Sequence, residues 1–165
     1  MLITNHVLSG ALIGALTRHP VPAFAIGVAS HFALDALPHW GEWRSRGHFM
    51  SVAVPDGLTG LATMGLLTAV ARPEQRLAVM AGMAGAALPD LDKPAMMWLG
   101  GSPWPAVVDR FHTEIQDEAP DRCRRELATA ALLAVAGVLA IRMPGRAIAS
   151  RRAIRSGRAG ARGRR

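Results

Sequence analysis

Tyrosine is absent from this 165-residue chain, and cysteine occurs once, at Cys123. A single cysteine excludes an intramolecular disulfide and any zinc cluster built from several thiolates. Aromatic residues make up only 5% of the sequence, whereas half of it is apolar, so small and aliphatic side chains must form the core. This composition favours closely packed helices over a β-sandwich.

Acidic residues are missing from the end of the chain. Residues 142–165 contain nine arginines and no Asp or Glu, which leaves ten basic and twelve acidic residues in the preceding 141. The sequence pI of about 11.5 therefore reflects the tail. We expect one helical domain over residues 1–143 and a basic, disordered tail over residues 144–165. No basic segment precedes the first apolar run, which disfavours a cleaved signal peptide.

Five apolar segments follow one another, at about residues 5–16, 22–37, 51 or 55–71, 74–88 and 126–141. Thr4 or Asn5 is available as the first N-cap, and a short amphipathic helix is expected near residues 106–118. Each apolar segment is near or slightly below the ~17–25 residues that span a bilayer. Several carry closely spaced small residues, as in Gly10-xxx-Gly14, which suit close helix packing. We predict an all-α, membrane-embedded bundle of about five apolar helices. The alternative is a soluble bundle with an Ala/Leu core.

The second segment ends in the most informative motif, His31-x-x-x-Asp35-x-x-x-His39. On a continuous helix, side chains at four-residue steps share one face, with neighbouring Cβ atoms roughly 5–6 Å apart. That spacing allows them to share a metal ion. Because the preceding run from Val21 to Ser30 has no charged residue, ionisable groups here are costly unless they are paired or bound to a cation.

Antiparallel packing of consecutive helices would bring further polar residues to the same end of the bundle. We call this the His/Asp end, and it is expected to gather His6, Asp35, His39, Asp56, Asp90, Asp92 and His112, with His31 slightly deeper. The opposite, basic end would gather Arg18, His19, Arg72, Arg76 and the tail. Four histidines and four aspartates suit one or two divalent cations such as zinc, manganese or iron.

We predict His6, His31, Asp35, Asp90 and Asp92 as metal ligands, and His39 and His112 as ligands or supporting groups. Asp56 is the candidate general base. Simpler interpretations remain open for most of these residues: His6 as a first-turn residue, Asp56, Asp90 and Asp92 as turn residues, and His112 as a surface histidine. The tryptophans near this end suit anchors at the membrane interface or groups that stack on a substrate.

The chain resembles the family of inner-membrane-associated metal-dependent hydrolases known as LexA-binding hydrolases. The resemblance rests on Thr4-Asn5-His6, on His31-x-x-x-Asp35-x-x-Pro38-His39 and on Leu88-Pro89-Asp90-Leu91-Asp92. The His-x-x-x-Asp element is also similar to that of zinc-dependent phospholipases C and single-strand-specific zinc nucleases. The family pattern continues with a His-Arg pair and a Thr-His-Ser element, where this chain has Arg110-Phe111-His112. The resemblance implies a hydrolase.

The leading hypothesis is a membrane-bound, metal-dependent hydrolase of a phosphoester, including lipid phosphoesters. In a second hypothesis the metal or polar cluster only stabilises helix packing in a non-catalytic membrane protein. In a third, the Arg-rich tail binds nucleic acid or anionic lipid by counterion release, against the simpler interpretation of the tail as a solvated anchor. Arginine in the tail predicts a multi-pass inner-membrane protein with its C-terminus in the cytoplasm and its His/Asp end facing outward.

Overall fold

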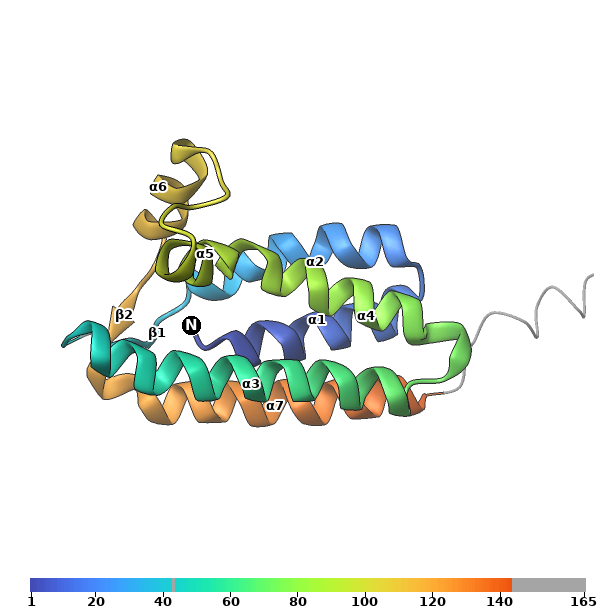
Figure 1. Ribbon diagram of the computed structural model, residues 1–165. Helices are drawn as coiled ribbons and strands as arrows, with labels where there is room; N and C mark the ends of the chain where they lie inside the picture. Colours follow the sequence, from blue (N-terminus) through green and yellow to red (C-terminus); the bar gives the residue numbers. More distant parts are fainter. Residues whose placement is uncertain (43, 144–165) are drawn as a thin grey trace, which may run out of the picture.

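The computed structural model describes residues 1–42 and 44–143, and these are predominantly helical (Figure 1). Its five long helices are α1 Ile3–Thr17, α2 Pro20–Asp35, α3 Arg46–Val70, α4 Pro73–Ala87 and α7 Cys123–Arg142. This confirms the predicted all-α bundle. The predicted tail, residues 144–165, lies outside the described residues.

Short elements cover one end of the bundle. They are β1 His39–Trp40, the 3-10 helices η1 Leu88–Leu91 and η2 Pro120–Arg122, the helices α5 Asp92–Trp98 and α6 Ala106–Glu114, and β2 Glu118–Ala119. The two strands pair in parallel, with His39 opposite Glu118. In Figure 1, α5, α6 and both strands lie at the same end as the N-terminus. The His/Asp end is therefore capped by these short elements.

Prolines set several helix boundaries. Pro20 and Pro73 occupy the first positions of α2 and α4, where a missing N–H costs nothing. Helix α2 ends at Asp35 rather than near residue 37. The physical reason is Pro38, because a proline disfavours helical backbone at the residue before it. This early end decides where His39 lies.

Helix α1 is the central element, with α2, α3, α4 and α7 packed around it. Glycines permit its close approach to α4. A Cβ at Gly82 would lie 2.2 Å from the Gly10 carbonyl oxygen, and one at Gly14 would lie 2.3 Å from the Ala78 carbonyl oxygen. The predicted role of Gly10-xxx-Gly14 in close packing is therefore confirmed. By contrast, Gly57 faces open space.

The outer surface of the bundle is strongly apolar. Large apolar side chains that are exposed on α3 and α7 include Leu58, Leu61, Leu66, Val70, Leu127, Leu132, Val135 and Leu139. Among the helices that the structure describes, α3 alone is long and apolar enough to cross a membrane by length and composition. That helix is also little covered by the rest of the protein.

Candidate metal centre

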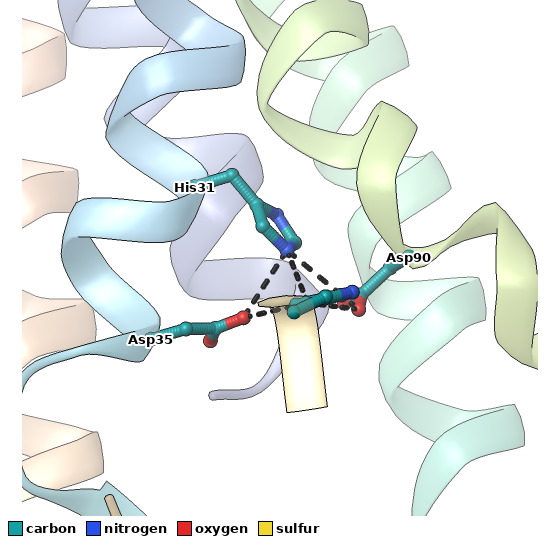
Figure 2. A group of neighbouring side chains, drawn as sticks. His31, Asp35 and Asp90 are labelled. Atoms are coloured by element: carbon teal, nitrogen blue, oxygen red, sulfur yellow. Dashed lines mark hydrogen bonds and ion pairs between the residues drawn. The ribbon is translucent and has the colours of Figure 1, made fainter. Parts of the chain in front are cut away.

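Two ligands of the candidate centre come from the last two turns of α2. His31 and Asp35 are four residues apart on one face, and both are buried. His31 Nε2 lies 3.2 Å from Asp35 Oδ2. Figure 2 shows both side chains directed toward Asp90, which enters from the 3-10 helix after α4. The His-x-x-x-Asp spacing therefore places both side chains on one face of the helix, as the sequence predicted.

His112 brings a second imidazole from α6, a segment far away in the sequence. Its Nε2 lies 2.9 Å from Asp35 Oδ2 and 3.0 Å from His31 Nε2. The same nitrogen lies 3.7 Å from Asp90 Oδ1, and His31 Nε2 lies 3.8 Å from that oxygen. One ligand atom from each of these four residues falls within 4.8 Å of the others.

The hydrogen bond on the far side of His31 determines which nitrogen faces the centre. His31 Nδ1 lies 2.7 Å from the carbonyl oxygen of Ala86, which can only accept a hydrogen bond. A neutral His31 must therefore carry its proton on Nδ1 and turn the Nε2 lone pair toward His112 and the two carboxylates. Metal-binding histidines are oriented in this way by a carbonyl or carboxylate behind the ring.

Asp92 and Lys93 lie at the start of α5, on the edge of the centre. Asp92 Oδ2 is 3.7 Å from His112 Nδ1, and the Lys93 ammonium donates a hydrogen bond to Asp90. Although burial raises the pKa of Asp90, the charge of Lys93 and the nearby imidazoles of His6 and His31 lower it below its usual value. Asp90 is therefore a carboxylate at neutral pH.

Burial lowers the pKa of His112, but hydrogen bonds to Asp35 and Asp92 outweigh burial and raise it to about 9. Without a cation, His112 is thus protonated at neutral pH and supplies positive charge between the carboxylates. A divalent cation would replace this proton, since only a deprotonated imidazole nitrogen binds a metal. A metal would thus take the place of the His112 proton as the positive charge between the carboxylates.

His6 adjoins the centre from the first turns of α1. Its ring stacks on that of His31 with 3.9 Å between the ring centroids, and its Nε2 lies 3.1 Å from Asp35 Oδ1. Neither of its ring nitrogens has a hydrogen-bond partner of good geometry among the described residues, although the ring is fully buried. The Met1 amino nitrogen also reaches Asp35 Oδ1, at 2.8 Å. A buried imidazole without such a partner, next to four possible ligand atoms, is available to bind a cation.

The structure places His39 apart from these residues. Because α2 has ended, His39 lies in β1, where its Nδ1 is 2.8 Å from the Leu37 carbonyl oxygen and its Nε2 is 3.6 Å from Glu118 Oε1. Its buried ring thus packs between the α2–β1 connection and β2. The helix ends before His39, so the four-residue spacing is not continued. His39 therefore does not join the group of four ligand residues, which are His31, Asp35, Asp90 and His112.

Asp56 accepts hydrogen bonds from the first turn of α1 rather than contacting the group of four. Its Oδ2 is 2.6 Å from the Ile3 backbone nitrogen, and its Oδ1 accepts from Thr4. Glu126 of α7 acts likewise, with Oε1 2.7 Å from the Leu2 nitrogen and 2.8 Å from Asn5 Nδ2. Because α1 begins at Ile3, the predicted N-cap residues Thr4 and Asn5 lie inside the helix, and Leu2 is at the cap position. Carboxylates from α3 and α7 satisfy the N-terminal N–H groups instead. The assignment of Asp56 as a general base stays a prediction.

Sequence reasoning missed Lys93 and Glu126. Lys93 directly follows Leu88-Pro89-Asp90-Leu91-Asp92, and a cation beside two carboxylates was a visible signal. Glu126 is buried at the start of the apolar run of α7. An acid at that position needs a partner, but only the fold shows that the partner is α1.

No family model, curated protein or solved structure matches this chain.

Proposed function

We propose that the protein is a membrane-bound hydrolase of phosphoesters that depends on a divalent metal, of which zinc is the best match and manganese or iron the alternatives. The observation that carries the proposal is the buried group of His31, Asp35, Asp90 and His112. Two imidazoles and two carboxylates suit these cations by ligand type. The resemblance to metal-dependent hydrolases in the sequence supports the same reaction class.

The orientation of the ligands is compatible with a metal ion between them. The nearest approach of His31 and His112 joins two Nε2 atoms, at 3.0 Å. Two lone pairs cannot face each other at this distance without a proton or a cation between them. The Ala86 carbonyl prevents a neutral His31 from supplying that proton, so in the metal-free protein it comes from the protonated His112. A metal would satisfy both nitrogens and both carboxylates together.

A bound metal would lower the pKa of a water molecule and polarise a phosphoryl oxygen. The surrounding residues have separate tasks. Lys93, held by Asp90 and Asp92, presents positive charge to an anionic phosphate. Asp92, at the edge of the group, is placed to hold His112 through Nδ1. Hydrolysis would form a bond from the water oxygen to phosphorus and break the bond to the ester oxygen.

The apolar exterior supports a position in the membrane. Leucines and valines are exposed on α3 and α7 and form an apolar surface. Contact of this surface with water is unfavourable, whereas contact with lipid chains is not. Arg18 and Arg72 at the basic end donate hydrogen bonds to carbonyl groups at the end of α7, as suits side chains at an interface. We propose several membrane-crossing helices in the inner membrane, with the basic end in the cytoplasm.

The proposal is tested by elemental analysis and hydrolysis assays on the detergent-purified full chain. We expect bound zinc, manganese or iron, and metal-dependent release of nitrophenolate from butyl 4-nitrophenyl phosphate. His31→Ala and Asp35→Asn should lose both the metal and the activity. His19→Ala, a histidine at the start of α2 and the far end of the bundle, is the matched control and should retain both.

Absence of a transition metal from wild-type protein, after loading and gel filtration at neutral pH, would overturn the metal site. Bound metal without turnover of any phosphoester would instead favour the second hypothesis, a cluster that stabilises helix packing. In that case His31→Ala would lower the melting temperature without an activity to lose. Deleting residues 146–165 and measuring salt-dependent DNA binding tests the proposal that the tail binds nucleic acid.

A further inference from the structure

An apolar groove passes beside the candidate metal centre and follows α3. It encloses about 420 Å³ between α3, α1 and α5, a size typical of small-molecule sites. Along α3 its walls extend from Phe49 to Met64, with Asp56 near the middle. At 1.5 Å per residue the apolar part from Asp56 to Met64 is about 12 Å long, somewhat less than half of a ~30 Å hydrocarbon core.

On the α3 wall, the lining of this groove is apolar beyond Asp56. Its polar side chains, Asp56, Asp90, Lys93, Gln116 and Glu118, all come from the His/Asp end. The side chains toward the other end are apolar, among them Leu58, Leu61 and Met64 of α3 and Val7 of α1. Two of the polar residues, Asp90 and Lys93, also belong to the metal centre or contact it. The groove therefore adjoins the centre at Asp90.

We propose that the groove binds one acyl chain of an anionic phosphoester lipid, with the phosphate at the metal centre beside Lys93. This inference rests on the proposed function and names its substrate class. The occupant follows from the charge and shape of the site. An anionic head suits Lys93 and a divalent cation, and an unbranched chain suits a long apolar groove without polar groups at its far end. Gly57, whose Cβ position meets no atom within 4 Å, leaves room for the chain.

The acyl chain would also limit how the substrate lies during hydrolysis. The chain in the groove fixes the phosphate at the centre, so water attacks phosphorus and the ester oxygen departs while the acyl-bearing part stays bound. Longer chains bury more apolar surface, so they should bind more tightly. A substrate that carries only a short alkyl group would lose this contribution.

A chain-length series tests the proposal. Alkyl 4-nitrophenyl phosphates with butyl, octyl, dodecyl and hexadecyl chains share one leaving group, so differences in kcat/KM report on the chain. With metal-loaded full chain in amphipol, we expect kcat/KM to rise by at least about tenfold from butyl to dodecyl, since each buried methylene adds to binding. Equal kcat/KM for all four esters would overturn the acyl groove while leaving the hydrolase intact.

Two glycine variants provide the matched comparison. Gly57→Leu places a side chain in the groove. Gly65 lies eight residues further along α3 and outside the lining of the groove, and a Cβ there also meets no atom within 4 Å, so Gly65→Leu is the control. We expect Gly57→Leu to reduce the dodecyl-to-butyl ratio of kcat/KM to a few-fold, and Gly65→Leu to leave it at the wild-type value. Metal content and melting temperature show that both variants fold. An unchanged ratio in Gly57→Leu would contradict the proposal.

Binding of hexadecyl phosphate decides the matter if no ester is hydrolysed. Its affinity for the wild type, Gly57→Leu and Gly65→Leu is measured by calorimetry with butyl phosphate as reference. Tighter binding of the long chain to the wild type and Gly65→Leu than to Gly57→Leu would support a lipid site even where the hydrolase proposal fails. Equal binding of both phosphates to all three proteins would overturn it.

Discussion

The two ends of the bundle handle charge in opposite ways. At the His/Asp end, polar side chains from α1, α2, η1 and α6 are buried against one another, and Asp35 alone contacts three imidazoles. At the basic end, Arg18, Arg72 and Arg76 each donate to backbone carbonyl groups, partly or wholly in contact with solvent. At the basic end, arginines therefore cap helix C-termini without the free-energy cost of burying a charge.

This difference indicates which end carries function. Burying charged groups costs free energy that well-packed apolar residues would not require. A fold that only needed to close its helices could use caps like those at the basic end. Retaining a buried group of ionisable residues at the other end therefore points to a task, and the geometry of these residues could hold a metal ion.

Removal of one carboxylate should separate the two ends most strongly. Asp35→Ala removes the carboxylate that lies beside His6, His31 and His112, and breaking such a buried cluster typically costs ~3–5 kcal/mol. Arg72→Ala at the basic end should cost about 1 kcal/mol or less. Reversible unfolding in mixed detergent measures both. Equal costs at the two ends would remove the contrast.

Metal removal should act on the His/Asp end alone. A metal held at one hundred times its dissociation constant contributes about 2.7 kcal/mol of stability, which a chelator should abolish. Hydrogen exchange should then increase at the end of α2, in η1 and in α6, and not around Arg18 or Arg76. A uniform increase over the whole bundle would argue against a localised centre.

Metal affinity should depend on pH through His112. In the metal-free protein its pKa is raised to about 9, so its contribution to folding is complete below the unfolded value near 6.5 and is lost as pH rises through 9. Metal binding must displace this proton, so affinity should increase up to about tenfold per pH unit between pH 7 and 9. Calorimetry in buffers of different ionisation enthalpy counts the protons released. A pH-independent affinity would show that His112 is not a ligand.

The smallest effect is expected from the caps of α1. Asp56→Asn removes part of the capping interaction with Ile3 and Thr4 and should cost ~0.5–2 kcal/mol. Arg76→Ala, the comparable change at the basic end, should cost ~0.3–1 kcal/mol. If Asp56 only caps, kcat per bound metal stays near the wild-type value. A loss of kcat with normal metal content would instead support its role as general base.

Much of the site was predictable because connectivity constrains it. Short connections between apolar helices of similar length bring alternate helix ends together, so His6, Asp35 and Asp90 had to share one end. His112 follows because its segment begins at that end. Periodicity along α2 similarly placed His31 and Asp35 on one face.

The finer assignments were not predictable from spacing. Whether His39 extended the motif depended on where α2 ends, and a shift of two residues moves a side chain to another face. Whether Asp56 faced the centre or the first turn of α1 depended on how α3 lies against α1. Both questions concern packing between elements, which no local pattern encodes.

The sequence by itself determined the helices and the end at which the ionisable residues gather. Apolar runs bounded by proline specify helices, and their order along the chain specifies which ends meet. Only the tertiary structure decided which residues share a centre and which cap a helix, because these roles depend on distances of a few ångströms between side chains from different helices. Coordination and hydrogen bonding operate only at that range.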